Sequence, residues 1–458
     1  MAATPKNDFS KGSILGCILS MAVPTMVAQC VQVLYNIVDR MYLGHMMGGS
    51  SLALTGVGLT FPIIMLITAF ANLYGQGGGP LCSIYRGQGD LSRASRLMNN
   101  CFVLEVVTGA GLMAFFYLFM KPILYTFGAS DETWPYACAY LQIYLLGTVF
   151  NMVALGLNSF VNAQGFGRVG MVTTVAGCAV NLVLDPLFIF GLGLGVRGAA
   201  LATVLSQFVS AVWVLRFLTG PRALFDLSRP DMKLDPELDK QIVVLGFASF
   251  MMSVTNSVTQ VACNAVLSAV GGDIYVGVMT VVNSIREVTQ MPCTGVTHGS
   301  QPVIGYNYGA GQYARTRRCI LTMTALTFGI SLATWLLILA LPAQLMGLFT
   351  TDQALISAGV PALHTFFFGY FMMTFQFCGQ STYVALGRSK YAIFFSTLRK
   401  LVIVTPLTFI LPQVAGLGVM GVFLAEPISN FIGGIACYAT MLATAWRDLV
   451  RKEKAAAQ

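Results

Sequence analysis

Charged residues are scarce in this chain: Asp, Glu, Lys and Arg together make up only 10% of its 458 residues. Soluble domains carry about 25% charged residues, so the shortage excludes a soluble globular protein. Hydrophobic residues make up 56% of the chain, and the mean hydropathy is +0.73. The composition therefore predicts an all-α polytopic membrane protein.

Signals for enzymatic chemistry, metal binding and secretion are also missing. The three histidines stand singly, none of the eleven cysteines forms CxxC, and no P-loop is present. The polar segment Met1–Lys11 is followed by an apolar run without a small-residue cleavage site, so we expect no signal peptide. We expect no enzyme, no cofactor, no structural metal and no disulfide. We attribute the net charge of +8 to membrane topology and expect no nucleic-acid partner.

Apolar runs long enough to cross a bilayer, about 20 residues each, recur along the chain. Twelve are expected, centred near residues 26, 64, 107, 146, 179, 206, 252, 289, 330, 370, 402 and 432. With the N-terminus inside, 20 of the 26 Lys and Arg residues fall on the same side of the membrane. Because cytoplasmic loops carry an excess of Lys and Arg, we expect both termini in the cytoplasm.

An internal repeat divides the chain into two halves. Residues 193–198 (GLGVRG) align with 416–421 (GLGVMG) at an offset of 223. Residues 75–96 align with 297–318 at an offset of 222, which pairs Pro80 with Pro302, Gly87 with Gly309, Gly89 with Gly311, Arg93 with Arg315 and Arg96 with Arg318.

The repeat predicts two pseudo-symmetric six-helix bundles, the second starting near Leu238. The expected domains are an N-terminal bundle (1–220), a cytoplasmic linker (221–239), a C-terminal bundle (240–446) and a cytoplasmic tail (447–458). Parallel repeats of this kind place the binding region between the halves, near the membrane midplane.

Polar side chains form stripes inside these apolar helices. In the first span, Gln29, Gln32, Asn36 and Asp39 follow one helix face at steps of three, four and three. Pro24 removes a backbone hydrogen bond in the same span, so we expect a bend there that acts as a hinge. The alternative is a polar seam that holds helices together.

The fifth span carries a carboxylate deep in an apolar run. Asn181 and Asp185 lie four residues apart, on one helix face, directly before Pro186. An acid inside a membrane is costly and is interpreted as functional by default. The alternative is a structural aspartate bonded to neighbouring hydroxyls. The repeat pairs Asp185 with Thr405, so the fold alone does not require an acid at this position.

Three motifs carry a family resemblance: YNIVDRMYLGH at 35–45, NLVLDP at 181–186 and QPVIGYNYGAG at 301–311. Together with the duplicated spans, they resemble the multidrug and toxic compound extrusion (MATE) family, and its DinF/MepA-like branch in particular. The resemblance covers residues 13–445 and implies the MATE fold in a bacterial inner membrane. It implies an antiporter that exports mostly cationic, amphipathic compounds in exchange for H+ or Na+. Nothing in the sequence signals an oligomer, so we expect a monomer.

The resemblance also implies a cation-coupling site at Asp39, Asn181, Asp185 and Thr203. Two carboxylates, an amide and a hydroxyl are hard oxygen ligands, which suit a sodium ion or a proton shared between the acids. The four residues form a metal site only if the coupling ion is Na+. The repeat pairs Thr203 with Glu426, so this site is expected in the first half alone.

Candidate residues for a substrate cavity lie on the polar stripes and on the seam between the halves. Glu287 is expected to attract cationic substrates, and the alternative is an ion pair with Arg286 or Arg399. Glu426 fits either role, and Asn158 fits inter-helix hydrogen bonding equally well. The full predicted set is Gln32, Tyr35, Asn36, Met65 and Asn158 in the first half, and Ser253, Gln260, Asn283, Glu287 and Met291 in the second.

Two other functions are weighed against the antiporter. A flippase for lipid-linked oligosaccharides, from the same superfamily, would want a more basic cavity than Arg286 and Arg399 supply. A channel or receptor predicts neither the duplicated cytoplasmic motif nor a paired acidic site. Both features are present, so the sequence favours an antiporter.

Overall fold

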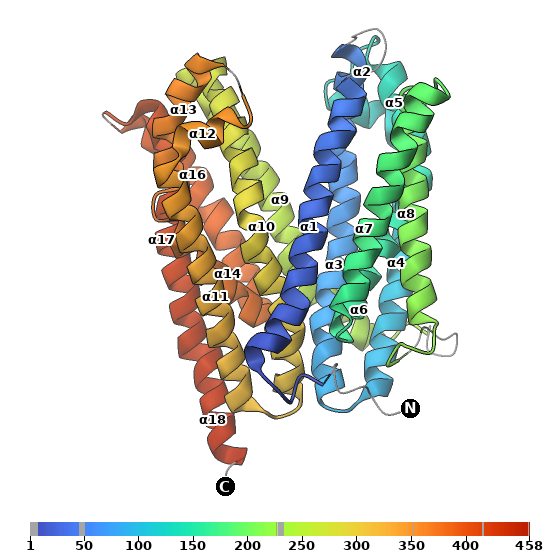
Figure 1. Ribbon diagram of the computed structural model, residues 1–458, viewed down its shortest axis with the longest axis vertical. Helices are drawn as coiled ribbons and strands as arrows, with labels where there is room; N and C mark the ends of the chain where they lie inside the picture. The colour runs from blue at the N-terminus through green and yellow to red at the C-terminus, as the bar shows by residue number, and fades with distance from the viewer. Residues whose placement is uncertain are drawn as a thin grey trace. The chain divides into compact units, whose positions relative to one another are not determined.

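The structure of the protein is a computed structural model. It describes residues 8–44, 51–225, 227, 233–350, 352–414, 416–456 and 458. Every regular element in this part of the chain is helical (Figure 1). By packing, the chain divides into a first unit of residues 1–8 and 27–246 and a second unit of residues 9–26 and 247–458. The domain boundaries expected from the repeat stay predictions, because this division follows contacts alone.

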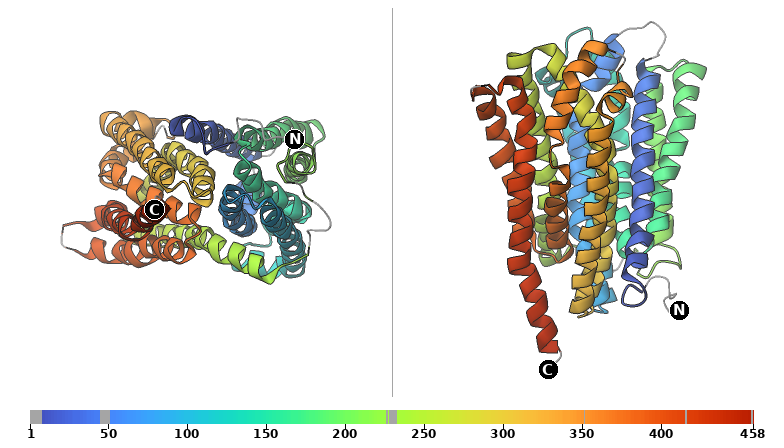
Figure 2. Two further views of the ribbon diagram at one scale, coloured as in Figure 1. Left: turned by 90° about the horizontal axis from the view of Figure 1, so that it is seen from below. Right: turned by 60° about the vertical axis from the view of Figure 1, so that its left-hand side comes forward.

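The helices of the first unit run side by side along a shared direction (Figure 2). They are α1 (Ile14–Gly44, from Val27 onward), α2 (Ser51–Gly58), α3 (Phe61–Gly87), α4 (Leu91–Thr126), α5 (Trp134–Leu146), α6 (Thr148–Ala163), α7 (Gly167–Pro186), the π-helix η2 (Leu187–Gly191), α8 (Val196–Leu218) and the start of α9 (Pro236–Gly271).

The second unit contains the beginning of α1, the rest of α9 and the remaining helices. These are α10 (Asp273–Gly309), α11 (Tyr313–Ala340), α12 (Pro342–Gly347), α13 (Gln353–Phe366), η4 (Tyr370–Met372), α14 (Met373–Ala385), α15 (Ser389–Thr397), the π-helix η5 (Leu398–Val404), α16 (Thr405–Ile410), η6 (Leu411–Gln413), α17 (Gly418–Met441), the π-helix η7 (Leu442–Trp446) and α18 (Arg447–Ala456).

Nine helices within the described residues are long and apolar enough to cross a membrane, or eleven if each of two bent pairs counts as one span. The bent pairs are α5 with α6 and α13 with α14, at 53° and 43°. The predicted eighth span corresponds to α10, which has 37 residues but is not among those eleven. Its polar stripe of Thr, Asn, Glu and Gln residues lowers its hydropathy. The chain is thus a multi-pass membrane protein.

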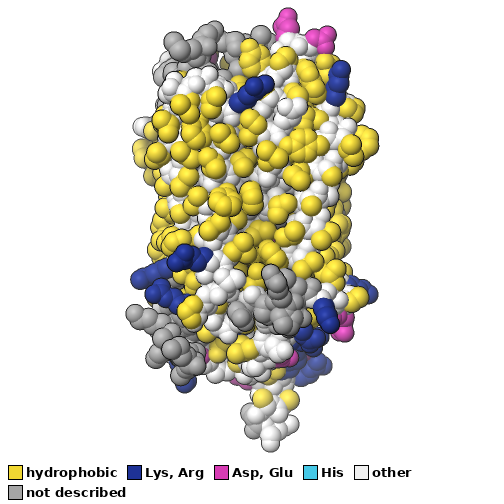
Figure 3. Space-filling view, turned by 90° about the vertical axis from the view of Figure 1, so that its right-hand side faces the viewer, with side chains coloured by type: hydrophobic (Ala, Val, Ile, Leu, Met, Phe, Trp, Pro, Cys, Tyr) yellow, Lys and Arg dark blue, Asp and Glu magenta, His cyan; other side chains and the backbone are white. Residues whose placement is uncertain are grey.

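The surface of the first unit agrees with this conclusion. Figure 3 shows a face whose middle is covered by hydrophobic side chains, while Lys and Arg side chains gather at its two ends and mostly at the lower one. Leu118 on α4 is 78% exposed and Val183 on α7 is 67% exposed. Large aliphatic side chains exposed in this way contact lipid in a membrane protein. The side of the membrane on which each terminus lies stays a prediction.

The repeat is visible in the local geometry of corresponding turns. In the first unit, α3 ends at Gly87 and Gly89 adopts a φ of 81°; in the second, α10 ends at Gly309 and Gly311 adopts a φ of 73°. Positive φ favours glycine, which explains why both copies keep it. Each turn also closes with one backbone hydrogen bond of 3.0 Å, from Asp90 to Tyr85 and from Gln312 to Asn307.

Close helix contacts through glycine hold the first unit together. A Cβ added to Gly75 on α3 would lie 2.8 Å from the Cα of Gly156 on α6. A Cβ added to Gly246 on α9 would overlap the carbonyl oxygen of Leu73 on α3. Small residues allow the backbones of membrane helices to approach closely, which strengthens their van der Waals packing.

The beginning of α1 packs within the second unit. The Asn307 Nδ2 atom donates to the Phe9 carbonyl oxygen at 3.2 Å, and Arg315 donates to the same oxygen at 3.0 Å. A Cβ added to Gly299 on α10 would lie 2.5 Å from the Cα of Ala22 on α1. Pro24 follows shortly after, and α1 continues through it without interruption to Gly44.

Candidate functional site

The first unit brings together the four residues of the predicted coupling site. Asp39 comes from α1, Asn181 and Asp185 from α7, and Thr203 from α8. Asn181 and Asp185 are each 1% exposed, Thr203 is buried, and Asp39 is half-buried. The carboxyl groups of Asp39 and Asp185 lie close enough to interact electrostatically. Helices far apart in the sequence therefore converge on one acidic pair.

Asn181 links this pair to α8. Its side-chain nitrogen can donate to the Asp185 Oδ2 atom at 2.6 Å while its oxygen accepts from the Thr203 backbone N–H at 3.2 Å. This orientation of the amide satisfies both of its ends. The i,i+4 spacing of Asn181 and Asp185 on α7 makes the first contact possible, as the sequence predicts.

One carboxylate oxygen of the acidic pair has no hydrogen-bond donor among the described residues. The Asp185 Oδ1 atom is buried and accepts no hydrogen bond from the described residues. Two neighbouring carboxylates away from water cannot both stay ionised unless a proton or a cation joins them. The geometry thus creates a place where one positive charge is strongly favoured.

Two tyrosine side chains lie beside Thr203 in the predicted coupling site. Tyr35 of α1 and Tyr140 of α5 both lie close to the Thr203 hydroxyl, which itself donates to the Ala199 carbonyl oxygen at 3.0 Å. Tyr35 is in the predicted substrate set, whereas Tyr140 is not predicted from the sequence. Its only signal is the i,i+4 spacing with Tyr144, whose ring stacks on it at 5.9 Å.

The regular α-helix is interrupted directly after Asp185. Helix α7 ends at Pro186, and the next five residues form the π-helix η2. Proline cannot donate the backbone hydrogen bond that an α-helix requires, and short π-helices are frequent at functional sites. Among the described residues, no three His, Cys, Asp or Glu side chains gather closely enough to hold a metal ion.

The other predicted residues of the first unit have varied surroundings. The Gln32 Oε1 atom accepts from the Cys178 thiol at 3.8 Å, so α1 contacts α7 there. Asn158 donates to the Gly170 carbonyl oxygen at 3.2 Å, which fits the alternative of inter-helix bonding. Met65 is 62% exposed. The side chain of Asn36 lies outside the described part of the structure.

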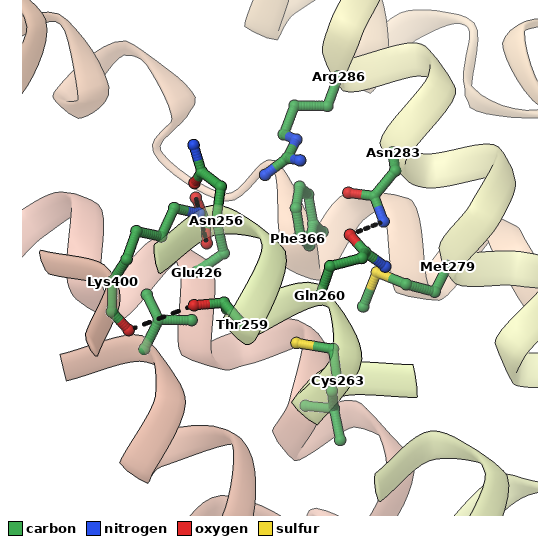
Figure 4. A pocket seen from close by; sticks show the side chains of 12 residues that line it. Asn256, Thr259, Gln260, Cys263, Met279, Asn283, Arg286, Phe366, Lys400 and Glu426 are labelled. Atoms are coloured by element: carbon green, nitrogen blue, oxygen red, sulfur yellow. Dashed lines mark hydrogen bonds and ion pairs between the residues drawn. The ribbon is translucent and has the colours of Figure 1, made fainter. Parts of the chain in front are cut away.

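In the second unit, the structure gathers some of the predicted residues and separates others. Asn283 of α10 donates to Gln260 of α9 at 2.9 Å, and both line one pocket (Figure 4). Met291 is buried, while Ser253 and Glu287 are exposed. Glu287 forms no ion pair with a described residue, so the alternative pairing with Arg286 or Arg399 is not seen.

Glu426 takes the structural role that the sequence left open. It accepts from the Arg399 Nη1 atom at 2.9 Å and from the Lys400 Nζ atom at 2.9 Å. The Arg399 Nη1 atom also donates to the Asn430 Oδ1 atom at 2.8 Å. All four side chains are buried, and Arg399 and Lys400 lie on the π-helix η5. Lys400 and Glu426 of this cluster line the pocket in Figure 4.

Comparisons with known proteins agree with this architecture. Residues 24–187 and 248–410 both match the family model described as MatE. The multidrug export protein MepA of Staphylococcus saprophyticus is 24% identical over 432 residues, which cover 94% of this chain and 95% of the relative. MepA of Staphylococcus aureus is 23% identical over 411 residues, which cover 89% of this chain and 90% of that protein.

Solved structures show the same fold. A multidrug resistance MATE family transporter of the MOP superfamily, in an outward-facing conformation, superposes with a TM-score of 0.91 at 25% identity and covers 99% of this chain and 100% of its own. A MOP superfamily transporter from Pyrococcus furiosus, described as having a binding pocket of reverse polarity, gives 0.89 at 25% identity, with 96% and 97% covered. These matches confirm the predicted fold class.

Proposed function

The chain belongs to the MatE family, and from that premise we propose that it is a secondary antiporter that exports amphipathic, mostly cationic compounds in exchange for H+ or Na+. The family membership confirms the resemblance carried by the three sequence motifs. Relatives that match almost the whole chain are named multidrug export proteins, which supports transport rather than catalysis. A bacterial cell membrane with both termini in the cytoplasm is the location that fits.

The acidic pair of Asp39 and Asp185 is the observation that carries this proposal. A proton or cation between the two carboxyl groups removes their repulsion, and its departure restores it. Occupied and empty states of the site therefore differ in charge and prefer different conformations of the first unit. Downhill entry of the ion then drives the conformational change that moves a second compound outward.

The hydrogen-bond directions favour a proton as the coupling ion. Sodium prefers several oxygen ligands, but the Asn181 amide can direct its nitrogen toward Asp185 and its oxygen toward the Thr203 backbone. A proton requires only one acceptor and one donor oxygen, which the two carboxyl groups supply. The Thr203 hydroxyl, surrounded by Tyr35 and Tyr140, is then a positioning group in the proposed site.

Pro24 is the proposed hinge. It lies three residues before Val27, where α1 passes from the second packing unit to the first. A helix that lacks one backbone hydrogen bond at this point bends more easily than its neighbours. Asp39 lies on the same helix. A change of its charge can therefore alter the direction in which α1 continues after Pro24.

The proposed function is tested by transport in proteoliposomes. Purified protein is reconstituted with an imposed pH gradient, an imposed sodium gradient, or both, and efflux of ethidium is followed by fluorescence. We expect the pH gradient to drive ethidium movement and the sodium gradient alone to drive none. Movement with sodium alone reverses the assignment of the ion. No movement of any organic cation under either gradient rejects the antiporter and favours the flippase as the remaining candidate.

Replacement of Glu287 by Gln is expected to change the substrate range more than the coupling. Glu287 is an exposed carboxylate without an ion-pair partner in the described residues, so it is free to attract cations. We expect KM for divalent organic cations to rise about tenfold, with the proton dependence unchanged. The matched control is Glu132→Gln, at an exposed position in the first unit. Loss of proton dependence in Glu287→Gln, with KM unchanged, contradicts the assignment.

A further inference from the structure

The pocket of the second unit contains more positive charge than negative charge. Arg286, Lys400 and Glu426 line it, and Arg399, which does not line it, pairs with Glu426 at 2.9 Å. Three cationic groups and one carboxylate leave a formal net charge of +2. Unbalanced charge inside a membrane protein is costly, and it is neutralised by a partner in nearly all cases.

Arg286 is the cation that lacks an acidic partner. Its guanidinium points into the pocket from α10, toward the side where Asn256 and Glu426 lie (Figure 4). Within the described residues it forms no ion pair, and its Cζ atom lies 6.0 Å from the centroid of the Phe366 ring. Glu426 is occupied by Lys400 and Arg399, so it cannot neutralise Arg286 as well.

The remaining lining supplies hydrogen-bond donors. The Asn256 side chain makes no hydrogen bond to a described residue. Asn283 donates to the Gln260 Oε1 atom at 2.9 Å and Gln260 donates to the Asn264 Oδ1 atom at 3.0 Å, so each of these two amide nitrogens keeps a second N–H. Primary amides and guanidinium groups are the donors that bind carboxylates and small anions. The cavity has a volume of about 20 Å³, which is room for one small ion or one anionic group but not for a drug.

By the repeat, this pocket is the counterpart of the acidic site, and its charge has the opposite sign. Thr203 pairs with Glu426 and Asp185 pairs with Thr405, so the pocket occupies the place in the second half that the acidic pair occupies in the first. The Thr405 hydroxyl bonds to the Lys400 carbonyl oxygen at 2.9 Å, and therefore holds the cationic segment in position. A cation that suits the first site is repelled by the second.

We propose that the pocket of the second unit binds one small anionic group, either a free halide ion or the carboxylate of a zwitterionic substrate. The anion pairs with Arg286, accepts from the Asn256 amide, and offsets the excess charge of the cluster. This site is distinct from the acidic pair and goes beyond the proposed cation-coupled export. It adds zwitterionic compounds to the substrates that the protein accommodates.

Thermal unfolding of the full-length protein in lipid nanodiscs tests the site. Sodium gluconate is replaced stepwise by sodium chloride or sodium acetate at constant ionic strength, and the unfolding temperature is recorded. We expect a saturable rise, because a ligand that binds only the folded state stabilises it. In Arg286→Gln the apparent affinity for the anion should fall at least about tenfold. Arg197→Gln, at an exposed arginine of the first unit, should leave it unchanged.

A second variant is expected to change the anion response in the opposite direction. Glu426→Gln removes the carboxylate, so the pocket becomes more positive and the rise with chloride should become larger than in the unmodified protein. The chloride response of Glu426→Gln tests the anion site even if Arg286→Gln does not fold. Equal anion responses in Arg286→Gln and the unmodified protein overturn the proposal, as does the absence of saturation. A smaller response in Glu426→Gln overturns it too.

A pair of dyes distinguishes the two sources of the anionic group. Rhodamine 110 carries a free carboxylate, and rhodamine 123 is its methyl ester. If the carboxylate of a substrate enters the pocket, chloride weakens the binding of rhodamine 110 but not that of rhodamine 123, and Arg286→Gln abolishes the difference. If both dyes bind equally and chloride still stabilises the protein, the site takes a free halide.

Discussion

Replacement of Asp39 by Asn, or of Asp185 by Asn, is expected to reduce gradient-driven efflux to the level of protein-free vesicles. Asn has the shape of Asp but neither ionises nor shares a proton with a carboxylate at neutral pH. With one carboxyl group left, the repulsion that distinguishes the empty site from the occupied site disappears. The energy of the ion gradient then no longer reaches the conformational change.

The same variants are expected to remain folded. Asp185 is 1% exposed and one of its carboxylate oxygens has no donor, so the loss of its charge removes a cost rather than a contact. Placing a charged aspartate at the centre of a membrane helix costs about 3 kcal/mol on insertion scales. We therefore expect an unfolding temperature at or above that of the unmodified protein, measured in the same detergent.

Asp352→Asn is the matched control for these two variants. Asp352 caps α13 by accepting from the Ala354 N–H at 2.9 Å, and Asn caps a helix as well as Asp does. We expect wild-type efflux and stability in this variant. Wild-type gradient-driven efflux in Asp39→Asn or Asp185→Asn contradicts the coupling site. Unfolding of both variants would instead favour the alternative of a structural aspartate.

Part of the proposed coupling site can be predicted from the sequence because some of its signals are local. The spacing of Asn181 and Asp185 fixes their common helix face, and the cost of an acid in an apolar run marks it as unusual. The repeat is local in the same sense, since Gly89 and Gly311 are kept where the backbone needs a positive φ. Features set by one helix turn or one backbone conformation are visible in a single sequence.

Contacts between distant helices could not be predicted in this way. Tyr140 approaches Thr203 from a helix 63 positions earlier, and the sequence holds no pattern that relates the two. Lys400 appears as one of two adjacent cations near a predicted span, but its partner Glu426 lies 26 residues away. Which side chains meet depends on helix rotation and crossing angle, which the packing of the whole unit determines.

Replacement of Gly246 by Ala is expected to destabilise the first unit strongly. A Cβ at this position would overlap the Leu73 carbonyl oxygen and lie 2.7 Å from its carbonyl carbon. The obstacle is backbone, so no side-chain rotation relieves it, and α3 and α9 must separate. We expect a loss of at least about 3 kcal/mol of unfolding free energy, seen as a lower unfolding temperature and poor yield.

The control for this variant is Gly111→Ala on α4, where an added Cβ meets no atom within 4 Å. Alanine favours a helix over glycine by about 1 kcal/mol, so this variant should be as stable as the unmodified protein or more so. Opposite outcomes of one substitution at two helical glycines separate packing from helix propensity. If Gly246→Ala is as stable as Gly111→Ala, the close approach of α3 and α9 is not what holds the unit together. In that case the Tyr85–Gln241 hydrogen bond of 2.8 Å between the same helices becomes the contact to remove next.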